Sequence, residues 1–251
     1  MFAAKGKGSW WGLGLLGMLL LSEAGVAMPK PMRETLAQQV ETVSPDEIRA
    51  AAERAFAEAE RLLFEEGTAE SRQQAIEKYQ EALQRWRDVG DREREALTLL
   101  ALGFTYESLG EMDRALEYYQ QALPLFQALG DRAGEAVTLN NIGWVYSALG
   151  EKQKALEYYQ QSLPLSQAVG ARAQEAVTLN NIGGVYSDLG EQQQALEYYE
   201  QALPLRRAVG DLAGEAVTLS KMGAVYNDLG EKQKALEYYE QSLLLSRTVD
   251  D

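Results

Sequence analysis

The chain has 251 residues, of which 24 are basic and 38 acidic, so its formal net charge is −14. An acidic surface repels phosphate backbones, which argues against nucleic acid as the main partner. The sequence contains no cysteine and no histidine, and this excludes thiol nucleophiles, disulfides, Cys/His zinc sites and histidine-based catalytic triads. We therefore expect a protein that is not an enzyme and that uses no metal or cofactor.

The N-terminal segment, residues 1–27, has the layout of a secretory signal peptide. Lys5 and Lys7 form a short basic region, and the uncharged run WWGLGLLGMLLL follows them. Gly25 and Ala27 occupy the −3 and −1 places of a signal-peptidase site. This layout predicts export, to the periplasm or out of the cell, after cleavage near Ala27. The alternative is an uncleaved membrane anchor, although the run is shorter than the roughly 20 apolar residues of a comfortable span.

The rest of the chain repeats itself with a period of 40 residues. Four copies of one motif, which reads AVTLNNIGWVYSALGEKQKALEYYQQSLPL in the second copy, begin at Ala96, Ala136, Ala176 and Ala216. A more diverged unit precedes them, and we expect residues 28–45 to form a flexible lead-in. A period of this length indicates a solenoid. The predicted array covers residues 46–251 in five units, at about 46–90, 91–130, 131–170, 171–210 and 211–249.

Each unit has the pattern of two helices joined by a turn. Apolar residues recur every three or four positions in both halves, as they do along one face of a helix. Gly150 and Gly170 follow the two halves of the third unit, at places where a glycine commonly ends a helix. Asp91, Asp131 and Asp211 follow such glycines, and aspartate is a favoured N-cap of the next helix. The pattern predicts an all-α fold.

Six positions that recur in phase resemble the tetratricopeptide repeat. In the third unit they are Ile142, Gly143, Tyr146, Gly150, Ala155 and Tyr159. The small glycine and alanine side chains let two helices approach closely, and the tyrosines fill the space beside that contact. The resemblance implies a right-handed α-solenoid of antiparallel helix pairs, the tetratricopeptide superhelix.

The repeat departs from the common form in its length and in its prolines. Its period exceeds the usual 34 residues, as in the long-helix repeats of kinesin light chains and bacterial peptide-sensing regulators. Pro124, Pro164 and Pro204 fall inside the expected second helices, where each removes one hydrogen bond and should bend the helix. The repeat sequence also resembles tetratricopeptide arrays of bacterial proteins with a caspase-like CHAT protease domain. One alternative is therefore that the chain is the repeat part of a larger protease-linked system.

The resemblance implies that the first helices line a concave groove and that side chains flanking the central glycine bind a partner. The predicted binding residues are Asn140, Asn141, Trp144, Ser147, Asn180, Asn181, Ser187, Asp188, Lys221, Asn227 and Asp228. Adjacent asparagines do little for helix stability, whereas a side-chain amide can both donate to and accept from a peptide backbone. We therefore predict a protein or peptide partner that binds as an extended or helical segment.

Several of these residues have a structural alternative. The asparagines can instead bond to one another or to the adjacent helix and keep the repeats in register. Trp144 is either an aromatic anchor for the partner or a packing residue between repeats. Lys221 is expected beside Asp228, where it either binds a partner carboxylate or remains a solvated charge. The counterparts of Trp144 in the other units, which we term the variable position, are Phe104, Gly184 and Ala224. Their changing size predicts a groove that is apolar towards its N-terminal end and open and polar towards its C-terminal end.

The expected last helix carries the apolar run Leu243 to Leu245, and no capping helix follows it in the sequence. Because solenoids need polar end caps, we expect this end to contact a second copy, another protein, or a segment missing from this chain. The leading hypothesis is a non-catalytic interaction scaffold that binds in its groove. The alternative is an architectural or self-assembling protein that acts through its ends.

Overall fold

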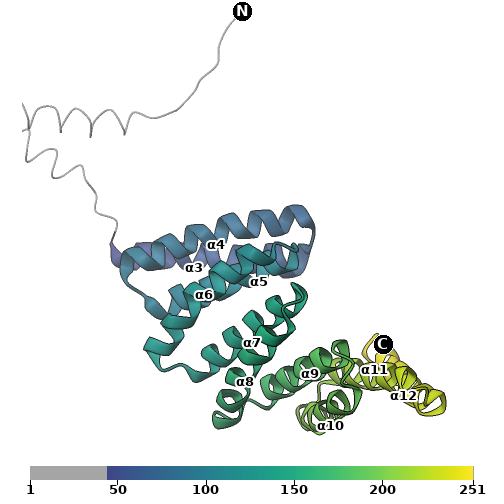
Figure 1. Cartoon of the computed structure of the whole chain (residues 1–251). Coiled ribbons are helices and arrows are strands. Elements are labelled where there is room, and N and C mark those ends of the chain that lie inside the picture. Colours follow the sequence, from purple (N-terminus) through teal and green to yellow (C-terminus); the bar gives the residue numbers. More distant parts are fainter. Residues whose placement is uncertain (1–43, 251) are drawn as a thin grey trace, which may run out of the picture. The chain divides into compact units, whose positions relative to one another are not determined.

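The computed structural model describes residues 44–250, and within them the chain folds as α-helices joined by short turns (Figure 1). The helices are α3 (Pro45–Arg61), α4 (Ala69–Val89), α5 (Arg92–Ser108), α6 (Met112–Leu129), α7 (Arg132–Ala148), α8 (Lys152–Ala168), α9 (Arg172–Asp188), α10 (Gln192–Val209), α11 (Leu212–Asp228) and α12 (Lys232–Asp250), with a π-helix, η1 (Leu62–Glu66), after α3. The all-α prediction is confirmed. The expected signal peptide lies outside the described residues.

The helices form consecutive pairs, and each pair packs on the next, which makes the fold an α-solenoid. The pairs are α3–α4, α5–α6, α7–α8, α9–α10 and α11–α12, and the second helix of each pair also contacts the first helix of the following pair. Pro45, which the sequence placed in the lead-in, is the first residue of α3. Proline suits that place, because the first N–H groups of a helix have no partner inside it.

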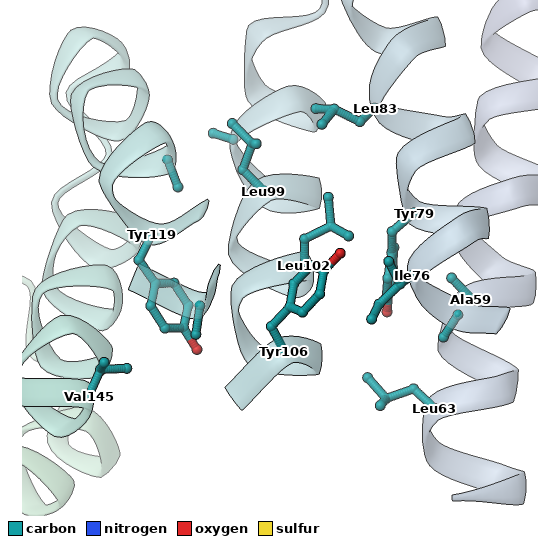
Figure 2. Close-up of a cluster of buried hydrophobic side chains, with 14 of the residues drawn as sticks. Ala59, Leu63, Ile76, Tyr79, Leu83, Leu99, Leu102, Tyr106, Tyr119 and Val145 are labelled. Carbon is teal, nitrogen blue, oxygen red and sulfur yellow. The ribbon is translucent and has the colours of Figure 1, made fainter. Parts of the chain in front are cut away.

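In the four pairs from α5–α6 to α11–α12, a glycine of the first helix contacts a tyrosine of the second. A methyl group added to Gly143 would lie 2.7 Å from Cε1 of Tyr159 and 3.2 Å from the carbonyl oxygen of Ala155. Only glycine leaves room for that ring, so the sequence pattern of the repeat follows from packing. Figure 2 shows the first part of this core, where Tyr79, Leu102 and Tyr119 come from successive helices and fill the space between them.

The predicted helix boundaries are confirmed at three of the first helices. The carboxylates of Asp91, Asp131 and Asp211 accept hydrogen bonds from backbone N–H groups three residues further on. Gly170 ends the preceding helix with a φ of 68°, a left-handed conformation that side chains rarely adopt. The helix that follows it, α9, begins after Ala171 and has no side-chain cap.

The three prolines lie inside second helices, as predicted. Pro124, Pro164 and Pro204 belong to α6, α8 and α10, each of which continues past its proline. Packing on both neighbouring helices holds these segments helical, although each proline removes one hydrogen bond.

Candidate functional site: the row of first helices

The first helices of successive units also contact one another, and this places their side chains in one row. Direct contacts join α5 to α7, α7 to α9 and α9 to α11. Residues at the same place in successive units are therefore spatial neighbours, although 40 residues separate them in the sequence. The predicted binding residues belong to this row, but the structure divides them into three groups.

Asn140 and Asn180 form bonds between repeats. Asn140 is only 4% exposed, and its Oδ1 accepts hydrogen bonds from Thr178 Oγ1 and from Asn181 Nδ2, both at 3.2 Å. One unit later, Asn180 Oδ1 accepts from Thr218 Oγ1 at the same distance. The structure places these two side chains between repeats, as the structural alternative predicts, and not on the open surface of the row. A buried amide needs such partners, and here they set the register of one unit on the next.

Asn141 and Asn181, the second asparagine of each pair, are half-buried and line hollows of the row. Both are tied to Asn140, since Asn140 Nδ2 donates to Asn141 Oδ1 at 3.3 Å and Asn181 Nδ2 donates to Asn140 Oδ1. These bonds fix the orientation of the two amides. Asn141 also bonds to the Tyr119 hydroxyl, and the amide atoms without such a bond can pair with a bound segment.

The first of the two hollows, which we term the apolar hollow, lies over the first three units. It has a volume of about 310 Å³. Its walls consist mainly of aliphatic and aromatic side chains. They are Leu63, Phe64, Tyr79, Leu97, Leu100, Ala101, Phe104 and Val137, with Glu60 and Asn141 beside them. Phe64 is 67% exposed and its ring stacks on Phe104 with a centroid distance of 6.3 Å. Exposed aromatic pairs of this kind mark binding surfaces more often than isolated apolar residues do.

The second hollow, termed the polar hollow, lies further along the row and has a volume of about 250 Å³. Polar groups from three units surround it. They are Ser147, Tyr159, Asn181, Ser187, Asp188, Tyr199 and Lys221, together with Trp144, Gly184, Val185 and Ala224. The Trp144 side chain is 37% exposed and forms one wall. The two hollows agree with the expectation of a groove that is apolar first and polar later.

Lys221 does not sit beside Asp228, as the sequence suggested, but in the polar hollow near Asp188. Burial lowers the pKa of the Lys221 ammonium, and the negative charge of Asp188 opposes that shift. Asp188 itself pairs with Lys152, whose ammonium also donates to the carbonyl oxygen and hydroxyl of Ser147, at 3.1 and 3.2 Å. Asn227 and Asp228 are exposed and line neither hollow.

A second half-buried charge, Glu107, occupies the place of Ser147 one unit earlier. Its Oε2 accepts a hydrogen bond from the Tyr119 hydroxyl at 2.7 Å. Burial raises the pKa of the Glu107 carboxyl, and the bond from Tyr119 offsets part of that rise. Within the described part of the chain, Glu107 forms no ion pair.

The sequence did not identify Phe64, Leu97 or Val137 as groove residues. Leu97 and Val137 lie one helical turn before Ala101 and Asn141 on the same faces, so helical periodicity could have found them. Phe64 lies in η1, within the diverged first unit, and has no counterpart elsewhere in the repeat. Across residues 44–250 no cluster of metal-binding side chains is found, and no helix there is long and apolar enough to cross a membrane.

Several solved structures have this fold. BtubC from P. vanneervenii is 24% identical, with a TM-score of 0.64 over 82% of this chain and 92% of that one. Aspartyl phosphate phosphatase F from Bacillus subtilis is 15% identical, with a TM-score of 0.70 over 95% of this chain and 62% of that one. The kinesin light chain repeats of Podosopora anserina are 17% identical, with a TM-score of 0.60 over 82% and 97%. At these identities the likeness concerns the fold.

No curated protein matches the sequence. The family model described as tetratricopeptide repeat, in contrast, matches residues 68–128, 94–168 and 170–247, which together make up more than half of the chain. The helix pairs and the Gly–Tyr contact agree with that match. The chain therefore belongs to the tetratricopeptide repeat family.

Proposed function

We propose that the protein is a non-catalytic interaction scaffold that binds a segment of another protein along its row of first helices. The observation that carries the proposal is the pair of hollows on that row, one apolar with an exposed aromatic pair and one polar with a lysine. A concave surface with aromatic anchors and a few oriented polar groups is typical of binding sites. Fixed amides at Asn141 and Asn181 would pair with the backbone of the bound segment.

The comparisons support a protein partner. One of the similar structures is a Rap protein complexed with competence and sporulation factor, with a TM-score of 0.70 and 16% identity over 89% of this chain and 60% of that one.

We also propose that the chain is exported, because its first residues have the layout of a signal peptide. The mass of the mature N-terminus tests this, and an intact Met1 on a protein inside the cell would contradict it.

Selection from a displayed library of random peptides, with the full chain immobilised, tests groove binding. Selected peptides should bind the double variant Phe104→Ala/Asn141→Ala at least about tenfold more weakly, because each change removes groups of a central contact. The matched control is Glu157→Ala/Gln160→Ala on the exposed face of α8, which should bind as the wild type does. Equal binding by all three chains would show that peptides bind elsewhere and would contradict the proposal.

A second candidate function, self-assembly through α12, rests on a different surface. Leu236, Tyr239, Leu243 and Leu244 are exposed on α12, whereas Leu156 and Leu196, which correspond to Leu236, are buried. Light scattering across a concentration series measures association directly. A monomer at high concentration that binds no apolar dye would argue against this candidate, whereas dimers that dissociate in Leu243→Glu would support it.

A further inference from the structure

The polar hollow exists because a large side chain is missing from one unit. Phe104 and Trp144 occupy the variable position in α5 and α7, but α9 has Gly184 there. A methyl group on Gly184 would meet only Nζ of Lys221, at 3.5 Å, and the hydroxyl of Tyr199, at 3.8 Å. These are ordinary contacts, so packing between the helices does not require a glycine. Its small size instead leaves the Lys221 ammonium beside an open space.

Lys221 also departs from the repeat, since the two preceding units have Asn141 and Asn181 at its place. Within residues 44–250 its ammonium forms no hydrogen bond and no ion pair, because the nearby Asp188 carboxylate is paired with Lys152. The Arg206 side chain adds a further positive charge near the ammonium, although Arg206 is itself paired with Asp211. The Lys221 side chain is half-buried, so its ammonium has lost part of its hydration without gaining a hydrogen bond, and an anionic ligand would compensate for that loss.

The other groups around the hollow suit the same ligand. The hydroxyls of Tyr159 and Tyr199 remain protonated, since burial raises the pKa of both, and Asn181 and Ser187 supply further donor groups. A volume of about 250 Å³ holds one side chain rather than a folded element. A single unpaired ammonium, with Asp188 close by, matches a single negative charge better than the nearly double charge of a phosphate.

We propose that the polar hollow binds the carboxylate of an Asp or Glu side chain in the segment that occupies the groove. Lys221 is the counter-ion of that carboxylate, and the Trp144 ring packs against its methylene groups. This inference rests on the proposed function, because the acidic side chain belongs to the bound segment. It adds a specificity that the amides of Asn141 and Asn181 alone do not provide.

The experiment is a selection of random displayed peptides on the full chain, repeated with Lys221→Asn and with Gly184→Trp. Lys221→Asn restores the residue of the two preceding units, and Gly184→Trp places the bulky side chain that Trp144 has one unit earlier into the polar hollow. Circular dichroism and urea unfolding verify that both variants fold. Wild type should select peptides with an acidic residue at one position. Neutralising that residue to Asn or Gln should weaken binding to wild type about tenfold or more, and binding to either variant less than about twofold.

The outcomes separate this inference from the proposed function. Selected peptides without an acidic position would overturn the inference alone. The same would follow if neutralising the acidic residue weakened binding to wild type and Lys221→Asn equally, or if Gly184→Trp kept the full acidic preference. If no peptide is selected by any of the three chains, peptide binding itself fails, and the inference fails with it.

Discussion

At the scale of single residues, position in the helix decides what a glycine or an asparagine does. Gly143 and Gly184 both lie within first helices, but a tyrosine ring covers the first and open space lies over the second. Asn140 and Asn141 are adjacent, yet the first bonds the next repeat and the second lines the apolar hollow. Successive residues of a helix point about 100° apart, so neighbours in sequence serve different surfaces.

The two glycines predict opposite responses to alanine. Gly143→Ala should lower the free energy of unfolding by about 1 to 3 kcal/mol, because the new methyl group overlaps the Tyr159 ring. Gly184→Ala should raise it by about 0.5 to 1 kcal/mol, since alanine is the better helix former and meets no clash. Urea unfolding of both variants measures the difference. Equal effects would mean that the close Gly–Tyr approach is not what holds the helix pair together.

Glu107 predicts a pH-dependent difference in stability. Burial raises the pKa of its carboxyl in the folded state, so the folded protein holds the proton more tightly than the unfolded chain does. Stability linked to this group is present below the unfolded pKa of about 4.3 and is lost as pH rises through the folded pKa. Glu107→Gln keeps an acceptor for Tyr119, and its urea midpoint should exceed that of the wild type at about pH 7.

The difference between Glu107→Gln and wild type should shrink as pH falls to about 4. Glu157→Gln on the exposed face of α8 removes the same charge and serves as the control. A gain in Glu107→Gln that stays constant with pH would contradict the assignment to this carboxyl.

At the scale of elements, the first helices differ in how they begin. The N-caps Asp91, Asp131 and Asp211 satisfy a backbone N–H that the helix itself leaves unpaired. The fourth unit has Ala171 at this place and lacks the bond. The unit still folds because α9 packs between α8 and α10 and against α7 and α11. Contacts with neighbours therefore compensate for a missing local signal.

Ala171→Asp should stabilise the protein by about 0.5 to 2 kcal/mol, the usual contribution of an N-cap. The first unit with such a cap has Arg94, not glycine, at the residue that donates the N–H, so Gln174 is no obstacle. Thermal and urea unfolding measure the gain, and Ala171→Asn is a control that lacks the charge but keeps the acceptor. No gain in either variant would mean that the N–H is already satisfied by water.

At the scale of the whole array, stability is a sum of units and of the interfaces between them. Leu196 on α10 is 3% exposed because α11 covers it, whereas the corresponding Leu236 on α12 is 50% exposed. Both leucines lie in the same stretch, ALEYYEQ, so their difference in burial comes from the neighbouring unit. Among the described residues, no further helix covers α12 as α11 covers α10, so the exposed surface of α12 lacks the stabilising contacts of an interface between units.

Leu196→Ala should therefore lower the free energy of unfolding by about 2 to 5 kcal/mol, and Leu236→Ala by less than about 1 kcal/mol. Urea unfolding measures both, and hydrogen exchange should find the amides of α12 less protected than those of α10. A large loss in Leu236→Ala would indicate that α12 is covered in solution, as it would be in a self-associated state.

The repeat and its helix boundaries could be predicted from the sequence because glycine, aspartate and small-residue signals recur in phase. The sequence does not reveal that Asn140 faces the next repeat, because two adjacent asparagines carry no sign of which surface each one serves. It suggests Asp228 as the neighbour of Lys221, but seven residues along a helix amount to roughly 10 Å. Its actual neighbour, Asp188, belongs to the preceding unit. The place of Phe64 in the apolar hollow could not be predicted, since no other unit resembles its segment. Contacts between units determine which side chains line the two hollows, and the sequence of a single unit does not reveal those contacts.

The hydrogen bond from Thr178 to Asn140 and the one from Thr218 to Asn180 join the same types of residue at the same distance. Removing residues 171–210 would bring Asn140 against Thr218, and this hydrogen bond between repeats would be kept, although Lys221 would take the place of Asn181 beside Asn140. Unequal recombination within such a gene can therefore shorten or lengthen the array while keeping the bond that sets the register. It would not be neutral for recognition, because the same deletion removes Gly184 and sets Trp144 directly against Lys221. Units can thus be gained or lost while the repeats stay in register, but each gain or loss alters the binding specificity of the groove.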